Sequence, residues 1–342
     1  MGNRIEDIAR LAGVSTATVS RAINSPEKVS PATRQKVESV ISAHGYTPNY
    51  FARGLMKHRT DSVGVLTSYH TNPYYTEIID TIVRAFTQNG TYLYLCNCEH
   101  DIELERKYTE ELLRRNIDAL IVVETPSLNT SENNFLYRQF DCPVILINQH
   151  LEPYGDAYII RCDQEPGIQE VFAYVQQHRL FPFVLFFGVD NSYSFRLKEE
   201  LFRKWKDQSG LSDRDVRLYR SEKLVDTNDE NTVWYTSEIL KELFAAPSRP
   251  RSIFTGNELM AMGALTAARE LSIPVPQELA VIGIDNTILS RISSPPLSTV
   301  DLRMRDIGNM AVELYLDIKN NGEKVHAKVQ SIPSRLCFRK SL

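Results

Sequence analysis

From Val63 onward the chain alternates short apolar segments with longer amphipathic ones. Nearly continuous apolar strands separated by amphipathic helices are typical of parallel sheets that are covered on both faces. In a chain of 342 residues this pattern predicts two α/β subdomains of similar plan. The expected strands cover 63–67, 92–96, 119–123 and 144–147, then 183–187, 216–220, 252–255 and 279–284. The expected helices cover 74–89, 103–115, 165–178, 194–208, 232–245 and 258–271, and a helix over 306–320 and a strand near 329–333 join one subdomain or the other.

The first 60 residues follow a different pattern, that of short helices. Apolar residues recur at helical spacing over 5–12. Ser15 is a typical N-cap for a second helix that runs to about residue 24, and Ser30, followed by proline, opens a third that ends at Gly45. Residues 46–61 predict a turn, a helix of about two turns that would be marginal alone in water, and a polar linker.

The net charge of −4 is unevenly distributed. Residues 1–60 hold nine Lys and Arg against four Asp and Glu, a net charge of +5, whereas the rest of the chain carries a net charge of −9. A small basic head on an acidic body favours an anionic partner for the head, because the body would repel nucleic acid. Taken alone, a segment with a net charge of +5 can also arise by chance, which is the alternative interpretation.

The second helix of the head has two chemically different sides. Small and polar side chains, together with one arginine, share its outward side. Because an arginine can donate two hydrogen bonds to a guanine, and threonine and alanine methyl groups can contact thymine, this side suits the major groove of DNA. A plain solvated helix face is the alternative. The outward residues are Thr16, Ala17, Ser20 and Arg21, and the inward ones are Val14, Val19, Ala22 and Ile23.

Four blocks of the head share their residue types and their spacing with one known family. They are Ile5–Asn24, Val29-Ser-Pro-Ala-Thr-Arg34, Gly45-Tyr-Thr-Pro-Asn49 and Ala52-Arg-Gly-Leu55. Together they resemble the helix-turn-helix head of lactose-repressor-type (LacI/GalR) transcriptional regulators. The resemblance implies a sequence-specific DNA-binding regulator, a repressor that acts as a cytoplasmic homodimer on pseudo-palindromic operator DNA.

The resemblance also implies a role for each matching residue of the head. Base contacts are expected from Thr16, Ala17 and Arg21, and from Leu55, which the family inserts into the minor groove. Ordinary packing is the alternative for Leu55. The family's hinge helix, which orders only on operator DNA, matches 48–56. Contacts with the phosphate backbone are expected from Ser15, Thr18, Asn24, Ser30, Thr33, Tyr46 and Asn49.

The body resembles the effector domain of the same family. The matching segments are Val63–Thr67, Asn72–Tyr75, Arg115–Ile121, Asn257–Gly263, Val281–Asn286 and Pro295–Val300. The implied fold is a small all-α helix-turn-helix head with an α/β body of two Rossmann-like subdomains, as in type I periplasmic binding proteins. The implied domains are 1–48 (head), 49–61 (hinge and linker) and 62–342, with an N-subdomain of 62–161 plus 294–322 and a C-subdomain of 162–293 plus 323–342.

The resemblance places an effector site between the subdomains, where the carboxyl ends of the strands lie. Tyr74 and Tyr75 are expected to stack on a ligand ring, and Asn148, Asn257 and Asp285 to bind its hydroxyl groups. For Asn257 and Asp285 a structural role is the alternative. Lys198 stands where the family usually has an arginine that clamps the ligand. Because lysine cannot form the two-pronged contact of an arginine, the sequence departs here from the family's sugar-binding pattern, and Arg196 is a candidate substitute.

Enzymatic function is not expected. The sequence has neither a Gly-rich phosphate-binding loop nor a metal-binding or nucleophile motif, so we expect no cofactor and no metal. Its five cysteines fit no CxxC pattern and are expected to stay reduced. No apolar run is long enough for a membrane span, and the first residues lack a secretory signal.

Two other functions share this fold. One is a cytoplasmic carbohydrate-binding protein, and the other is an architectural protein that binds DNA without sequence preference. The effector, which by resemblance is a sugar or a sugar derivative, the sign of its effect and the regulated genes do not follow from the sequence. A dimer face on the body is expected to include the helix over 75–82. Arg303 and Arg305 either lie solvated at the start of a helix or attract an anionic partner.

Overall fold

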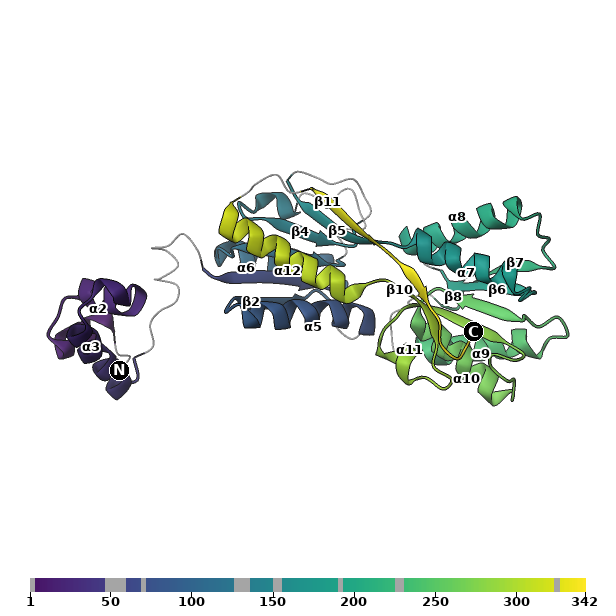
Figure 1. Cartoon of the computed structure of the whole chain (residues 1–342), viewed down its shortest axis with the longest axis horizontal. Coiled ribbons are helices and arrows are strands. Elements are labelled where there is room, and N and C mark those ends of the chain that lie inside the picture. The colour runs from purple at the N-terminus through teal and green to yellow at the C-terminus, as the bar shows by residue number, and fades with distance from the viewer. Residues whose placement is uncertain are drawn as a thin grey trace. The chain divides into compact units, whose positions relative to one another are not determined.

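The computed structural model describes residues 4–46, 60–68, 72–125, 136–149, 156–189, 193–224, 231–322 and 327–342. The chain forms two compact units, Met1–Thr60 and Asp61–Leu342 (Figure 1). The predicted hinge and linker, 49–61, lie outside the described ranges except for residues 60 and 61.

The head contains three α-helices, α1 (Ile5–Ala12), α2 (Thr16–Asn24) and α3 (Pro31–His44), with a short 3-10 turn at Pro26–Lys28. The predicted N-caps are confirmed, because the Ser15 Oγ accepts a hydrogen bond from the Thr18 amide at 3.1 Å and the Ser30 Oγ accepts one from the Thr33 amide at 3.3 Å. Gly45 ends α3 with a φ of 58°, a left-handed conformation that glycine adopts without strain. The small core of the head consists of Ile8, Ala9, Ala12, Val19, Ala22 and Val37.

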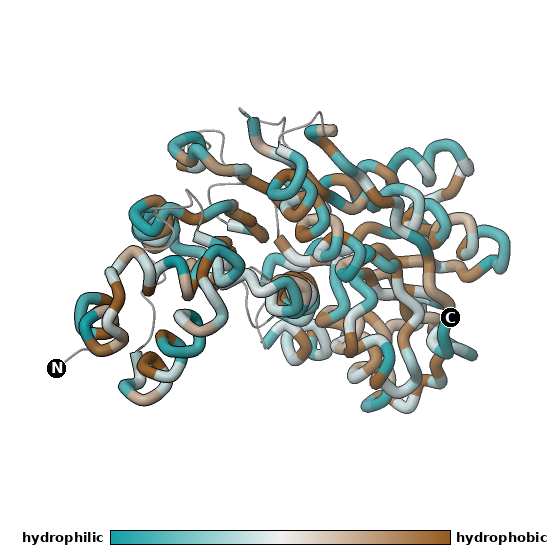
Figure 2. Tube along the Cα trace, turned by 60° about the vertical axis from the view of Figure 1, so that its left-hand side comes forward, coloured by the Kyte–Doolittle hydropathy of each residue, from teal (hydrophilic) through white to brown (hydrophobic). Residues whose placement is uncertain are grey.

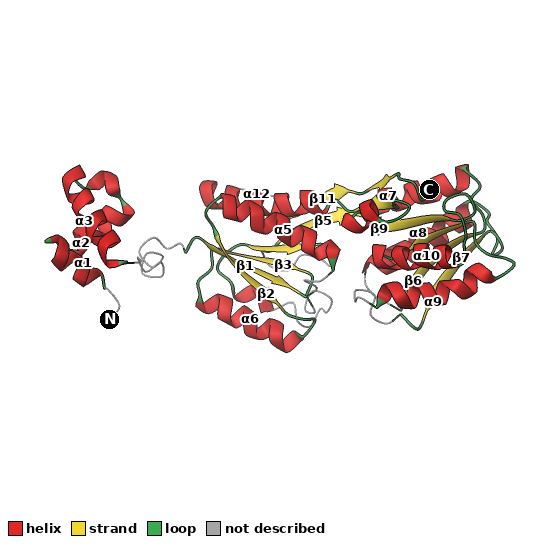
Figure 3. Cartoon of the chain, turned by 90° about the horizontal axis from the view of Figure 1, so that it is seen from below, coloured by secondary structure: helices red, strands yellow, loops and turns green. Residues whose placement is uncertain are grey.

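The second unit contains two six-stranded sheets, each covered by helices on both faces (Figures 1 and 3). Apolar residues concentrate along the strands, and hydrophilic ones lie on the outer turns of the helices (Figure 2). We call the two layered bodies the first and the second lobe. Within the described ranges, no helix is long and apolar enough to cross a membrane.

The sheet of the first lobe has the strand order β11-β5-β4-β3-β1-β2, and all of its pairs are parallel. Alternate residues of a strand face opposite sides, so Ile121 packs with α5 and α12 whereas Leu120 and Val122 pack with α6. The strands are β1 (Ser62–Thr67), β2 (Tyr92–Asn97), β3 (Ala119–Val123), β4 (Val144–Ile147), β5 (Tyr158–Asp163) and β11 (Val329–Pro333), and the helices are α5 (Pro73–Gln88), α6 (Ile102–Arg114) and α12 (Met304–Asn321).

The sheet of the second lobe has the strand order β12-β10-β9-β8-β6-β7, and only β12 is antiparallel. Helices α7 and α8 lie on one face, and α9 and α10 lie on the other (Figure 1). The strands are β6 (Phe183–Gly188), β7 (Val216–Ser221), β8 (Ser252–Thr255), β9 (Ala280–Asp285), β10 (Ser298–Asp301) and β12 (Arg335–Cys337), and the helices are α7 (Glu165–Gln177), α8 (Tyr193–Gln208), α9 (Thr232–Ala245), α10 (Glu258–Glu270) and α11 (Ile288–Ile292).

The predicted assignment of the C-terminal segments to the subdomains needs two corrections. Strand β10 was expected in the N-subdomain but pairs with β9 in the second lobe, and β11 was expected in the C-subdomain but pairs with β5 in the first. The helix between them, α12, packs on α5 in the first lobe as expected. The chain therefore crosses between the lobes three times, after β5, after β10 and after β11, and such crossings have no local sequence signal.

Candidate functional site

Helix α2 presents a polar side that the head does not cover. Thr16, Ala17 and Arg21 are exposed, whereas Val19 and Ala22 on the opposite side are buried in the core. This arrangement matches the predicted division of the helix into an inward and an outward side. An exposed row of small side chains with one arginine is chemically suited to the edges of bases in a major groove.

The residues predicted to contact phosphates lie mainly at the starts of two helices. The hydroxyls of Ser15 and Thr18 lie 2.9 Å apart at the start of α2, and those of Ser30 and Thr33 lie 2.8 Å apart at the start of α3. Helix N-termini carry partial positive charge and attract phosphate. The other described members of the set are more internal, since Asn24 donates to Ser20 at 3.2 Å and Tyr46 packs against the core. Asn49 and Leu55 lie outside the described residues.

In the first lobe, the side chains of Tyr74 and Asn148 contact each other next to the carboxyl end of β4. The side-chain amide of Asn148 donates to the Tyr74 hydroxyl, and its oxygen accepts a hydrogen bond from the Cys162 amide at 3.1 Å. The Tyr75 ring meets the Tyr74 ring edge to face, with centroids 4.9 Å apart. Tyr74 is buried and Tyr75 is partly exposed, and ring stacking on a ligand stays a prediction for both.

In the second lobe, Lys198 is buried although it carries a charge. Its ammonium group donates to the Ser194 carbonyl at 3.3 Å and to the Ser194 hydroxyl at 2.5 Å, and it lies 5.1 Å from the centre of the Phe195 ring. The Ser194 hydroxyl in turn donates to Gln164 at 2.8 Å. The candidate substitute Arg196 is exposed on the same helix. The buried cation near the strand ends is therefore Lys198.

Two carboxylates lie at the end of β9 and at the start of α10. The Asp285 carboxylate accepts a hydrogen bond from the Glu258 amide at 3.2 Å, and Asn257 caps α10 by accepting one from the Met260 amide at 2.9 Å. Burial, and then the Glu258 charge, raise the pKa of Asp285 well above its usual range, while the Lys198 charge opposes this shift. Asn257 and Asp285 thus each accept a hydrogen bond from the start of α10. Contacts of this kind are the structural role that the sequence analysis gave as the alternative to ligand binding.

Residues from both lobes meet at the strand ends. Burial raises the pKa of Tyr74 well above its usual value, and the charges of Cys162, Asp285 and Glu124 add to this shift. Asp285 belongs to the second lobe, so a group of that lobe contributes to the pKa shift of a tyrosine in the first. We call Tyr74 and Asn148 of the first lobe, together with Lys198 and Asp285 of the second, the candidate effector region.

Sequence reasoning missed the most connected residue of this region. Glu258 is buried, and its carboxylate accepts hydrogen bonds from the amides of Asn286 and Thr287 at 2.8 and 3.0 Å and from the hydroxyls of Thr287 and Thr299 at 2.5 and 3.0 Å. Burial raises its pKa. The residue lies inside a matched motif, but no local pattern indicates that a glutamate there is buried.

Models of two protein families match the chain. That of bacterial regulatory proteins of the lacI family matches residues 4–49, and that of a periplasmic binding protein-like domain matches residues 174–342. The ribose operon repressor of Escherichia coli K12 is 29% identical over 91% of this chain and 92% of its own length. The repressor PurR of Pectobacterium atrosepticum is 31% identical over 94% of this chain and 92% of its own length.

The chain belongs to the lacI family of bacterial regulatory proteins. Catabolite control protein A of Priestia megaterium is 30% identical over all of this chain and 99% of its own length, so the similarity spans both the head and the body. A lac repressor dimer bound to operator and an anti-inducer superposes with a TM-score of 0.82, at 23% identity, over all of this chain and 99% of that one. This lacI-family protein is therefore a DNA-binding transcriptional regulator and not an enzyme, as the sequence predicts.

Proposed function

We propose that this protein represses transcription as a homodimer in the cytoplasm and that a small carbohydrate bound between the lobes changes its affinity for operator DNA. The observation that carries the proposal is the exposed side of α2, where Thr16, Ala17 and Arg21 lie opposite the buried Val19 and Ala22. One head covers only a half-site, so a two-fold dimer on a pseudo-palindromic operator supplies the second reading helix.

The chemistry between the lobes supports a carbohydrate effector. Asp285 and Asn148 are hydrogen-bonding groups for hydroxyls, Lys198 is a donor, and Tyr75 offers an aromatic face. Among the relatives, the name of the Escherichia coli protein mentions a ribose operon, and a related regulator from Enterococcus faecium was solved with bound ribose. A neutral polyhydroxylated ligand fits a region that contains two carboxylates and one ammonium group.

Exposed apolar side chains support a dimer. Ile288 and Ile292 are 51% and 69% exposed, one helical turn apart on α11, and Trp234 and Tyr235 on α9 are 60% and 44% exposed. Exposed apolar residues of this size are typical of surfaces that a partner covers. On the helix first expected at the interface, Ile78, Ile79 and Ile82 are buried within the first lobe, so a second copy would meet its polar side.

The mechanism that we propose couples the two sites through the segment between the units. A ligand that binds one arrangement of the lobes more tightly than another shifts the balance between them. That shift changes the separation of the two chain segments that lead to the heads, and thereby the free energy with which the segment around Leu55 orders on DNA. We propose that Leu55 enters the minor groove at the centre of the operator.

Selection of genomic fragments by the purified protein at near-physiological salt tests this function. We expect a palindrome of about 14–18 base pairs, from the geometry of paired recognition helices. Leu55→Ala should lose this enrichment, whereas Leu11→Ala, at an exposed leucine of α1, should retain it. The genes beside the selected sites then nominate carbohydrates for binding measurements.

Two other results would each replace the proposal. Weak binding that is uniform in sequence and indifferent to Leu55→Ala would indicate an architectural protein. An absence of DNA binding together with tight carbohydrate binding would indicate a ligand-binding protein on the same fold.

A further inference from the structure

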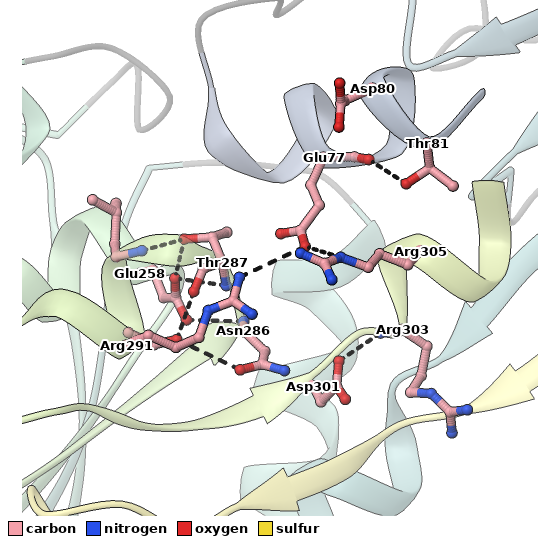
Figure 4. A network of polar contacts seen from close by, with 12 residues as sticks. Glu77, Asp80, Thr81, Glu258, Asn286, Thr287, Arg291, Asp301, Arg303 and Arg305 are labelled. Carbon is pink, nitrogen blue, oxygen red and sulfur yellow. Dashed lines mark hydrogen bonds and ion pairs between the residues drawn. The ribbon is translucent and has the colours of Figure 1, made fainter. Parts of the chain in front are cut away.

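Glu77 is a point of contact between the two lobes. It lies on α5 of the first lobe, and only 17% of its side chain is exposed. Its Oε1 is 2.6 Å from the Nε of Arg305 on α12 of the same lobe and 3.7 Å from the Nη2 of Arg291 on α11 of the second lobe (Figure 4). One carboxylate therefore pairs with an arginine from each lobe.

The first of these contacts is part of a rigid support. Helices α5 and α12 approach closely, since a Cβ at Gly308 would lie 3.0 Å from the Cβ of Thr81 and 3.1 Å from the Ile78 carbonyl. The ion pair of Glu77 with Arg305 therefore joins two helices that are packed together within one lobe. The contact with Arg291 is the one that would change if the lobes moved.

The helix that carries Arg291 begins at the candidate effector region. Thr287 is its N-cap and accepts a hydrogen bond from the Leu289 amide at 3.1 Å. The amide of Thr287 donates to the buried Glu258 carboxylate at 3.0 Å, and Asp285 accepts a hydrogen bond from the Glu258 amide at 3.2 Å. Figure 4 shows the hydrogen bonds between Glu258 and Thr287 and the ion pair between Arg291 and Glu77, at the two ends of α11.

We propose that α11 couples occupancy of the effector region to the arrangement of the lobes. Its first residues follow the position of the loop that contains Asp285, and its Arg291 forms an ion pair with Glu77 that stabilises the lobe arrangement seen here. The proposal rests on the proposed function in one respect, namely that a ligand binds beside Asp285. The ion pair itself acts with or without a ligand.

The expected size of the effect follows from the exposure of the two groups. Arg291 is 40% exposed, so solvent screens the pair and its contribution is small. Losing such a pair changes an equilibrium by about two- to fivefold. A change of this size is sufficient to alter a population of two lobe arrangements, and it leaves the fold intact.

The test measures the separation of the lobes in the full-length dimer, without DNA or ligand. One fluorophore replaces Lys107 on α6 of the first lobe and another replaces Lys204 on α8 of the second, both exposed positions. Doubly labelled chains are diluted with unlabelled protein, so that single-molecule energy transfer reports separations within one chain. The variants are Arg291→Met, Glu77→Gln, the double variant and, as a matched control, Arg84→Met, which removes an exposed ion pair with Asp80 on α5.

We expect Arg291→Met to favour a second lobe arrangement, seen as a second distance between the fluorophores. The ratio of its population to that of the arrangement seen here should increase about two- to fivefold over the ratio in the wild-type protein. Glu77→Gln should act in the same direction, and the double variant should add little, because both changes remove one contact. Arg84→Met should leave the distribution unchanged. Identical distributions for wild type and Arg291→Met, with unchanged thermal unfolding, would overturn the proposal. Because DNA is absent, this outcome is independent of operator binding, which the fragment selection measures separately.

A second variant tests the part played by α11. Thr287→Val keeps the shape of the side chain but removes the hydroxyl that caps the helix and contacts Glu258. We expect it to shift the separation in the same direction as Arg291→Met. If Arg291→Met changes the distribution and Thr287→Val does not, the ion pair acts alone and the proposed coupling through α11 is wrong.

Discussion

The ammonium group of Lys198 lies 3.3 Å from the backbone carbonyl oxygen of Ser194, one turn earlier on helix α8. The two residues form a polar contact inside the second lobe, and the Lys198 charge acts on the buried Asp285 carboxylate. The acceptors that Lys198 contacts in its own helix are neutral, and one of them is the Ser194 hydroxyl at 2.5 Å. In the proposed function, Lys198 takes the place of the arginine implied by the family resemblance, and its geometry differs because lysine is a point donor.

Replacing Lys198 should impair ligand binding. For the first carbohydrate that raises the unfolding temperature of the wild-type protein, we expect Lys198→Met to weaken binding about 10- to 100-fold, the range for a hydrogen bond to a charged group. Titration calorimetry measures the affinity. Lys204→Met, at an exposed lysine of the same helix, is the control and should bind like wild type. Equal affinities for Lys198→Met and wild type would remove Lys198 from the site.

The pH dependence of stability should reveal the buried carboxyl group of Asp285. Burial raises its pKa above the unfolded value of about 3.9, so the native state binds more protons and this group's contribution to the free energy of unfolding falls as the pH rises. The stability of Asp285→Asn relative to wild type should therefore increase between pH 4 and pH 7. Urea unfolding across this range measures the difference.

Asp215 provides a control of opposite sign. Hydrogen bonds from the Ser212 hydroxyl and amide, at 2.6 and 2.9 Å, lower its pKa. Its contribution is present above the unfolded pKa and is lost as the pH falls, so Asp215→Asn should lose stability relative to wild type as the pH rises. The same trend for both variants would contradict the assignment for Asp285.

A side chain at Gly167, in the first turn of α7, should destabilise the protein, because its Cβ would meet neighbouring atoms. A Cβ there would lie 2.6 Å from Val300 Cγ1 and 2.8 Å from Ser334 Oγ. We expect Gly167→Ala to lower the free energy of unfolding by about 1–3 kcal/mol, the usual effect of overpacking. Val300→Ala makes room, so the double variant should be more stable than the sum of the single effects predicts. Simple additivity in urea unfolding would show that Val300 is not the obstacle.

Arg21 should determine specificity more than general affinity for DNA. We expect Arg21→Ala to weaken binding to the selected operator by about 1–3 kcal/mol, because it removes a donor to a base, and to change non-specific binding little. Fluorescence anisotropy on operator and on scrambled duplexes, at one salt concentration, measures both. Arg10→Ala is the control, since Arg10 is an exposed arginine of the same head that pairs with Asp7. A uniform loss on both duplexes would make Arg21 a phosphate contact instead.

Local sequence patterns predicted two kinds of element well in both units, namely helices with one apolar side and strands that are apolar throughout. Apart from the short helix predicted within 46–61, which lies outside the described residues, the expected strands and helices agree with the observed ones to within two residues at each end, and the caps of α2 and α3 at Ser15 and Ser30 are confirmed. Strands β5, β10 and β12 and the five-residue α11 were missed. Each of these strands pairs with a strand that lies beyond a crossing between the lobes or across the α12 segment, namely β5 with β11 and β10 with β12, and such pairings leave no local signal.

The candidate ligand region shows the same limit. Resemblance indicated Tyr74, Asn148, Lys198 and Asp285, and the structure shows a hydrogen bond between the first two; their role in ligand binding stays a prediction. The resemblance could not indicate that Asn148 forms hydrogen bonds with Tyr74 and Cys162, or that the Glu258 carboxylate accepts a hydrogen bond from the loop after β9. The sequence does not indicate whether a given carboxylate is exposed or buried, because its burial depends on the residues that pack around it.

Helix caps, apolar periodicity and motif spacing are local properties of the chain, so the two kinds of unit, the two-sided helix α2 and the family could be predicted from them. The grouping of strands into sheets, the burial of charges and the contact of Glu77 in one lobe with Arg291 in the other emerge only in the folded chain. Burial and ion pairing depend on three-dimensional proximity. Residues 77 and 291 are brought together by two sheets and three crossings, and no spacing along the chain encodes that contact.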